Sequence, residues 1–265
     1  MIDIRLPADV LLTIGPVKFT NGHFTAMTIT VLFTVFALWF RGHIKLIPGR
    51  IQTAFEFITE FLMGQLEPAF QDRRRAEKFF PLLMTCLLFI LIANQFSLIP
   101  LVGNILVGDV HLFRTPTSDL AMTLALSLFI IGLANVLALA ISPLHHIGNF
   151  IRIVPILKAR NVGQFAQASL DFLLGLLDII SEAAKVLSLS GRLFGNIFAG
   201  EVMVAVISGL SIYTQFLAPI PFYFLSIFSG LIQTFVFVLL STQFIGSSLT
   251  SALDSKAANP APEVA

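Results

Sequence analysis

Long runs of apolar residues constrain this chain more than any other feature. A helix that crosses a bilayer needs about 20 predominantly apolar residues, and its backbone polar groups must be satisfied within the segment. Five segments are long and apolar enough: 23–40, 79–101, 120–142, 169–208 and 222–253. The sequence therefore predicts an all-α integral membrane protein, a single membrane domain with about five transmembrane helices.

Composition narrows the classes of function. The chain is 56% hydrophobic and 12% charged, with a net charge of +1. Because nucleic-acid binding needs a clustered basic face, we expect no nucleic-acid partner. The sequence has no phosphate-binding loop, nucleophile triad or zinc-ligand motif, so we expect no bound nucleotide, catalytic residue, metal or cofactor. His145 and His146 are adjacent in a loop, where solvation is commoner than metal binding.

Segment 51–70 has a different pattern, with apolar and polar residues on opposite helical faces. One face carries Ile51, Phe55, Ile58 and Leu62, and the other carries Gln52, Glu56, Thr59 and Glu60. This pattern is typical of an interfacial amphipathic helix that lies on the membrane.

Lysine and arginine are unevenly distributed among the loops. Eleven of the 16 lie in 41–78, 143–168 and the C-terminal tail, and three lie in the N-terminal segment and the 102–119 loop. The positive-inside rule then puts the N-terminus outside and the C-terminus in the cytoplasm. We expect residues 1–22 to form an external segment without a cleaved signal peptide, and 254–265 to form a disordered cytoplasmic tail.

The fourth apolar segment is unusually long and unusually charged. About 40 helical residues span roughly 60 Å, against about 30 Å of hydrocarbon, so this helix must tilt, bend or protrude. Together with the long fifth segment it predicts a slanted helix pair over 169–253. Its charged residues are Asp171, Asp178, Glu182, Lys185, Arg192 and Glu201. Ionisable groups at membrane depth are costly and usually mark ion paths.

Helical spacing separates these charges. Ser188, Arg192 and Asn196 fall near one stripe, whereas Glu201 lies about 180° away from Arg192. Small residues at 191, 195 and 199 permit close approach by another helix. The alternative for Arg192 is a structural ion pair with a neighbouring helix. The polar side chains of Asn94, Gln95, Asn135 and Gln233 in other spans predict interhelical hydrogen bonds or, alternatively, the lining of a water path.

The stretch "SLSGRLFGNIFAGE" at 188–201 closely resembles subunit a of the F-type rotary ATP synthases, whose fourth membrane helix carries R-L-F-G-N-x-x-A-G-E. Weaker landmarks are "SEAAKVLSL", "PGRIQTAFEFI", "IANQFSLIP", "TPTSDLAMTLAL" and "LIQTFVFVLL". The resemblance covers nearly the whole chain from the first span onward. It implies a non-catalytic stator subunit of the membrane sector, with a rotating c-subunit ring and the peripheral-stalk subunit b as partners.

The resemblance also implies roles for single residues. Arg192 aligns with the family's essential arginine, which makes a ring carboxylate release its ion and blocks leakage between two half-channels. A guanidinium is permanently charged in proteins, which suits this role. Glu201 aligns with an acidic half-channel residue, and Asn196 and Gln233 with polar positions near the arginine.

Other positions are assigned less directly. We expect Asp178, Glu182 and Lys185 in an inner half-channel, Asn94 and Ser226 as polar lining of an outer one, and Ser188 on the ion path. Asp178, Glu182 and Lys185 have an alternative, which is snorkelling or pairing among themselves. Ser226 stands where some family members have a histidine, so the relay near Glu201 must run through water and hydroxyls.

The resemblance implies an ion-translocating subunit. The proton is the expected ion and sodium the alternative, because the choice depends largely on the surroundings of a ring carboxylate on another chain. The absence of a targeting presequence favours a bacterial inner membrane. Two alternatives from other classes remain: a standalone secondary transporter or ion channel, and a structural scaffold. A standalone transporter would conduct by itself, and a scaffold would tolerate the loss of Arg192.

Overall fold

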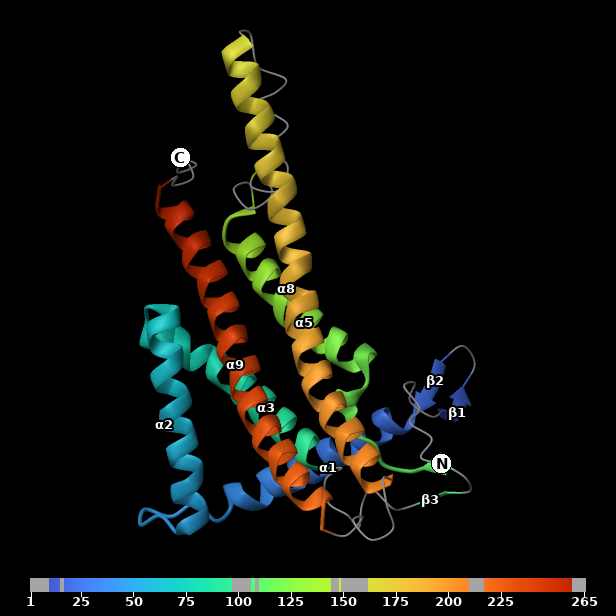
Figure 1. The fold of residues 1–265 in the computed structure, drawn as a ribbon. Coiled ribbons are helices and arrows are strands. Elements are labelled where there is room, and N and C mark those ends of the chain that lie inside the picture. The colour runs from blue at the N-terminus through green and yellow to red at the C-terminus, as the bar shows by residue number, and fades with distance from the viewer. Residues whose placement is uncertain are drawn as a thin grey trace.

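The structure is a computed structural model that describes residues 10–14, 17–96, 106–107, 110–143, 148, 162–209 and 217–258. Six long helices dominate these residues (Figure 1). They are α1 (Asn21–Arg41), α2 (Arg50–Phe70), α3 (Arg73–Phe96), α5 (Leu120–Ile141), α8 (Val162–Gly209) and α9 (Pro219–Ala258). The other described elements are two antiparallel hairpins and a 3₁₀ turn. The first hairpin pairs β1 (Val10–Ile14) with β2 (Val17–Thr20), and the second pairs β3 (Leu106–Val107) with β4 (Val110–His111). The 3₁₀ turn is η1 (Pro116–Ser118).

Four of the described helices, α1, α3, α5 and α9, are long and apolar enough to cross a membrane. The all-α membrane architecture expected from the sequence is thereby confirmed. The fifth expected span is α8, which is also long but carries charged side chains from Asp171 to Glu201. Helix α2 is amphipathic, and its inward stripe of Leu62, Leu66 and Phe70 is fully buried.

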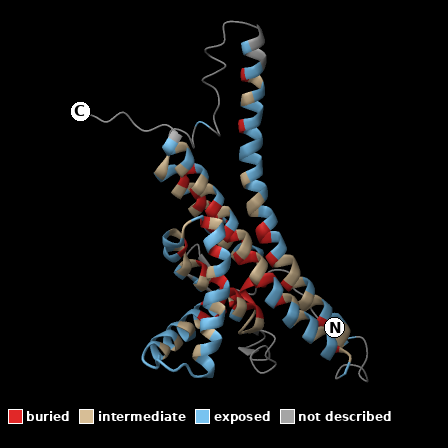
Figure 2. Ribbon diagram, turned by 90° about the vertical axis from the view of Figure 1, so that its left-hand side faces the viewer, coloured by how far each residue is buried: buried red, intermediate tan, exposed pale blue. Residues whose placement is uncertain are grey.

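Helix α9 is the centre of the bundle, packed against α2, α3, α5 and α8. Its buried residues recur every three or four positions, at Phe237, Ser241, Ile245 and Leu249. This is the spacing of one helical face. Figure 2 shows that buried residues gather where the helices cross. Because lipid is as apolar as these side chains, close packing rather than exclusion of water holds the helices together.

Helix α8 is the longest element, with 48 residues and no internal proline. At 1.5 Å per residue it spans about 72 Å, more than twice the hydrocarbon thickness of a bilayer. Its C-terminal half packs against α5 and α9, and its N-terminal end projects beyond both of them (Figure 1). The long helix pair expected at 169–253 is therefore present, with α8 protruding from the bundle.

Several boundaries differ from those expected. Helix α9 begins at Pro219 instead of residue 222, which is possible because proline is tolerated in a first helical turn. It continues to Ala258 instead of ending at residue 253. Residues 254–258 are thus helical instead of belonging to a disordered tail. Helix α3 begins at Arg73, inside the basic cluster. The hairpins were not predicted. Residues 1–9 and 259–265, and His145 and His146, lie outside the described residues.

Candidate functional site

Arg192 lies between Glu182 and Glu201 on α8, and its side chain is exposed. Within the described part of the chain, no hydrogen bond or ion pair holds its guanidinium. The neighbouring glycines at 191 and 195 are equally bare, since a Cβ added at either would meet nothing within 4 Å. The structural ion pair considered for Arg192 therefore finds no support among the described residues.

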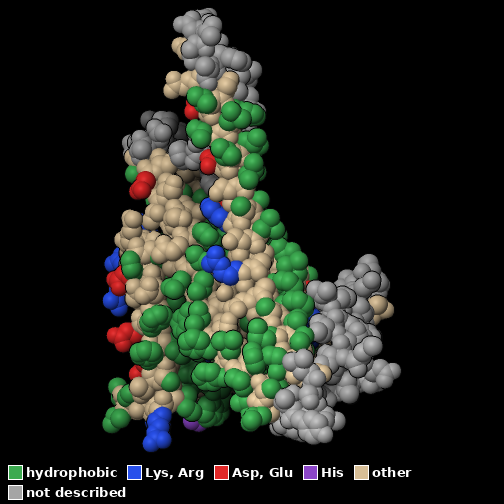
Figure 3. All heavy atoms as spheres, viewed as in Figure 1, with side chains coloured by type: hydrophobic (Ala, Val, Ile, Leu, Met, Phe, Trp, Pro, Cys, Tyr) green, Lys and Arg blue, Asp and Glu red, His purple; other side chains and the backbone are tan. Residues whose placement is uncertain are grey.

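The surroundings of this arginine are apolar. In Figure 3 the basic side chains near the middle of α8 are flanked by hydrophobic side chains on the face toward the viewer. Exposed side chains on this helix include Leu187 and Met203, and on α9 they include Phe224, Phe228 and Ile232. Ser188 and Ala199 are also exposed on α8. A permanent cation thus lies among small and apolar side chains on an open face.

Asn196 joins α8 to α9 through a reciprocal pair of hydrogen bonds. Ser229 Oγ donates to Asn196 Oδ1 over 2.6 Å, and Asn196 Nδ2 donates to the Ser229 carbonyl oxygen over 3.3 Å. Asn196 is one turn beyond Arg192, so this pair fixes the distance between the helices next to the exposed guanidinium.

Glu201 points to a different neighbour. The hydroxyl of Thr115 donates a hydrogen bond to Glu201 Oε1. Thr115 is fully buried and lies immediately before η1. Asp119 ends this turn and caps α5, because its side chain accepts a hydrogen bond from the Ala121 backbone N–H over 3.0 Å. The expectation that Glu201 and Arg192 face different surroundings is confirmed.

Asn94 on α3 connects three segments. Its Nδ2 donates to the Gly230 carbonyl oxygen over 3.3 Å and to Thr234 Oγ1 over 3.2 Å, while Thr117 Oγ1 donates to its Oδ1 over 2.6 Å. The next residue, Gln95, donates to the Ile227 carbonyl oxygen over 3.1 Å. Asn94 and Gln95 therefore make the interhelical hydrogen bonds that the sequence predicted as one of two roles, the other being the lining of a water path.

A polar cavity of about 20 Å³ lies between these elements. Ser226 of α9 is in it, opposite Gly200 of α8, where an added Cβ would come within 3.0 Å of Ser226 Oγ. The complete lining is Asn94, Thr115, Asn196, Ile197, Gly200, Glu201 and Ser226. Four of the residues singled out from the sequence therefore share one cavity, although they come from three helices.

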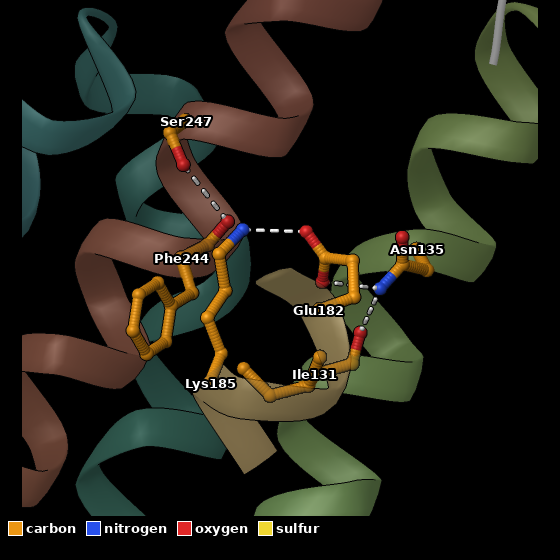
Figure 4. A network of polar contacts seen from close by, with 6 residues as sticks. All are labelled: Ile131, Asn135, Glu182, Lys185, Phe244 and Ser247. Carbon is orange, nitrogen blue, oxygen red and sulfur yellow. Dashed lines mark hydrogen bonds and ion pairs between the residues drawn. The ribbon is translucent and has the colours of Figure 1, made fainter. Parts of the chain in front are cut away.

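A second polar cluster lies nearer the N-terminal end of α8 (Figure 4). Lys185 Nζ contacts Glu182 Oε1 at 2.5 Å, and Asn135 Nδ2 of α5 donates to Glu182 Oε2 over 3.1 Å. The Lys185 ammonium also lies 5.6 Å from the centre of the Phe244 ring of α9. Glu182 and Lys185 therefore pair with each other, which was the alternative to their role in an inner half-channel. Asp178 is exposed one turn earlier on the same helix.

Gln233 is separate from both clusters. It is buried on α9, and its Nε2 has no hydrogen-bond partner among the described residues. Of the polar residues singled out within the apolar spans, it is the one whose amide nitrogen is left unsatisfied in the described structure.

Comparison with known proteins decides the family. The family model described as ATP synthase A chain matches residues 23–246. The chain belongs to the ATP synthase A chain family. It is 32% identical over 232 residues to ATP synthase subunit a of Desulfotalea psychrophila, an alignment that covers 85% of this chain and 82% of the relative. It is 30% identical over 260 residues to ATP synthase subunit a of Streptococcus pyogenes serotype M5, covering 95% and 99%.

The ATP synthase A chain match includes both polar clusters and the exposed arginine. Sequence analysis missed Thr115, Thr117 and Ser118, which form the hydroxyl-rich wall beside Glu201 and Asn94. The available signal was the stretch "TPTSD", which was noted as a family landmark without a role for its hydroxyl groups.

Proposed function

We propose that this chain is the ion-translocating stator subunit of an F-type ATP synthase, a non-catalytic membrane subunit that moves protons past a rotating c-subunit ring. Membership of the ATP synthase A chain family over most of the chain supports this function and does not favour a standalone transporter or ion channel. The observation that carries the proposal is the order of polar groups along α8.

Three polar positions follow one another along this helix. Glu182 precedes Arg192 by ten residues, and Glu201 follows it by nine. At 1.5 Å per residue the two glutamates are about 28 Å apart along the axis, close to the hydrocarbon thickness of a bilayer. Arg192 is midway. Two polar clusters at opposite depths with a fixed cation between them are what two offset half-channels require.

The outer half-channel in this proposal contains Glu201, Asn94 and Ser226, and the inner one contains Asp178, Glu182 and Lys185. Arg192 faces the ring from the bare surface made by Gly191, Gly195 and Ala199, with Ser188 one turn away. Asn196 and Gln233 act as polar residues beside the arginine. A ring carboxylate that reaches the guanidinium is favoured in its ionised form, so it gives up its proton there.

The partners and the location follow from this role. The c-subunit ring meets the exposed face of α8 and α9, and the membrane subunit b of the peripheral stalk meets α2. The chain is in a bacterial inner membrane with its N-terminus outside and its C-terminus in the cytoplasm. Its lipid contacts include the exposed apolar surface of α1, for example Leu32, Val35 and Leu38.

The test is ATP-driven proton pumping in membrane vesicles that contain the complete synthase. Wild type is compared with Arg192→Ala at equal subunit abundance. Arg192→Ala is expected to abolish pumping with the complex still assembled, because the other described cation of α8, Lys185, is paired with Glu182.

The matched control is Arg73→Ala. Arg73 is also an exposed arginine at a helix, and among the described residues its ion pair is with Glu77, at 3.3 Å on the surface. Unchanged pumping by Arg192→Ala would contradict the proposal and favour a scaffold. Proton conduction by the purified chain alone in liposomes would favour a standalone channel.

A further inference from the structure

We propose that Thr115 is the positioning residue for Glu201, and that the cavity beside them binds one water molecule that passes protons to the Glu201 carboxylate. This inference rests on the proposed function. It assigns the partner of Glu201 to the turn before α5, whereas sequence reasoning looked for that partner on the last helix.

Thr115 is suited to orient a carboxylate. Its hydroxyl donates to Glu201 Oε1, and the Ser118 hydroxyl and the Arg114 guanidinium of the same segment also interact with this carboxylate. The threonine is fully buried, and its β-branched side chain has few rotamers, so the direction of the hydroxyl is fixed by packing.

The turn that carries Thr115 is itself held rigidly. Ser118 Oγ donates to the Thr115 carbonyl oxygen over 2.9 Å, and the Arg114 backbone N–H donates to Thr25 Oγ1 of α1 over 3.1 Å. Thr117, in the same turn, donates to Asn94. The loop therefore presents two hydroxyls to two different polar residues of the cavity wall, and neither hydroxyl can move independently of the turn.

The cavity has the size and chemistry for a single water. Its volume of about 20 Å³ exceeds the 10–15 Å³ or so that one water needs. A bound water also needs two to four polar partners. The wall provides the Glu201 carboxylate, the amides of Asn94 and Asn196, and the Ser226 hydroxyl.

The proposed transfer leaves both the cavity water and Thr115 in their starting protonation states. The water donates one of its protons to the ionised Glu201 carboxylate and takes a proton from the water file outside, so it stays neutral. Thr115 keeps its own proton throughout and acts only by holding the carboxylate in place. Glu201 then gives this proton to an ionised ring carboxylate, which leaves the Glu201 carboxylate ionised again and ready for the next proton.

The main test removes only the hydroxyl. Thr115→Val has nearly the same shape as threonine, and Thr115→Ser keeps the hydroxyl without the methyl group. Thr123→Val is the matched control, because Thr123 is also buried beside this turn but its hydroxyl bonds only to backbone carbonyl oxygens of Asp119 and Leu120. ATP-driven proton pumping per assembled complex and the thermal stability of the complex are both measured in membranes with the complete synthase.

Thr115→Val is expected to lower pumping about tenfold, the effect of losing one hydrogen bond to a charged group. Thr115→Ser should retain most of the rate, and Thr123→Val should match wild type. Difference infrared spectra, with Glu201→Gln to identify the band, should show a shifted Glu201 carboxylate stretch in Thr115→Val. A loss of thermal stability with unchanged pumping per complex would show a structural role and overturn the inference.

A second variant tests the water. Gly200→Ala directs a methyl group toward Ser226 Oγ in the cavity, whereas Gly132→Ala on α5 adds the same methyl where nothing lies within 4 Å. Pumping should fall in Gly200→Ala alone. If Thr115→Val and Gly200→Ala both pump like wild type while Arg192→Ala does not, this inference fails and the proposed function stands. If Arg192→Ala also pumps, the proposed function fails.

Discussion

At the scale of single residues, the unsatisfied amide of Gln233 is the clearest departure from what stability alone would select. A buried donor without a partner costs about 1–3 kcal/mol, and an apolar residue of similar size would avoid that cost. The residue nevertheless lies on the best-packed helix of the bundle, next to the fully satisfied Thr234. This arrangement is typical of a group kept for function.

We therefore expect Gln233→Leu to separate stability from activity. The complex should melt at the same temperature or higher, since a gain of about 1 kcal/mol is expected from removing the orphaned donor. Pumping should fall, because the proposed function assigns this amide a role beside Arg192. Thermal melting of the purified complex and pumping in vesicles measure the two effects. A lower melting temperature would show that the amide is satisfied in the assembled complex.

The sequence allowed some residues of the site to be predicted and not others. Asn94, Asn196 and Glu201 are polar groups inside apolar helices, where each is conspicuous. Thr115 is in a loop, where hydroxyl groups are common and no periodicity indicates burial. Its partner is 86 residues away in sequence, and only the packing of η1 against α8 brings the two together.

At the scale of elements, helices α2 and α9 cross closely at Gly246. Among the described glycines, this is where another backbone comes nearest. A Cβ at Gly246 would come within 2.5 Å of the Ala69 carbonyl oxygen, which cannot move without shifting the end of α2. Apolar stripes predicted both helices from the sequence. The contact between the two helices depends on the lack of a side chain at Gly246. A hydropathy pattern does not show that a glycine is needed at this position.

Gly246→Ala is expected to destabilise this crossing by about 1–3 kcal/mol, the usual cost of overpacking. The matched control is Gly64→Ala on α2, where an added Cβ meets nothing within 4 Å. The control should be neutral or stabilising by up to about 1 kcal/mol, because alanine is the better helix former. Melting temperatures of the two purified variants provide the comparison. Equal melting would show that α2 moves freely against α9.

At the scale of the whole molecule, the proposed orientation rests on the distribution of lysine and arginine. The single cysteine of the sequence, Cys86, is buried, so a Cys86→Ser background is suited to labelling. In this background, Leu46→Cys on the α1–α2 connection should react with a membrane-impermeant maleimide from the cytoplasmic side. Thr13→Cys on β1 should react from the outside. Both positions are exposed.

Inverted vesicles and spheroplasts present the two sides separately. Leu83→Cys is the negative control, since Leu83 is fully buried and should not react in either preparation. Reaction of both exposed positions from the same side would contradict the orientation. The class of fold, a bundle of membrane-spanning helices, could be predicted because the lengths of the apolar segments decide it. The order in which the helices pack around α9 depends on side-chain shape, so it could not be predicted.

The way the polar cavity is built has a consequence for biosynthesis. Its walls come from α3, the turn before α5, α8 and α9, so they span from Asn94 to Ser226. A nascent chain therefore contains no proton-accepting pocket until its last helix has entered the membrane and docked. Half-made or truncated chains cannot short-circuit the membrane through this cavity.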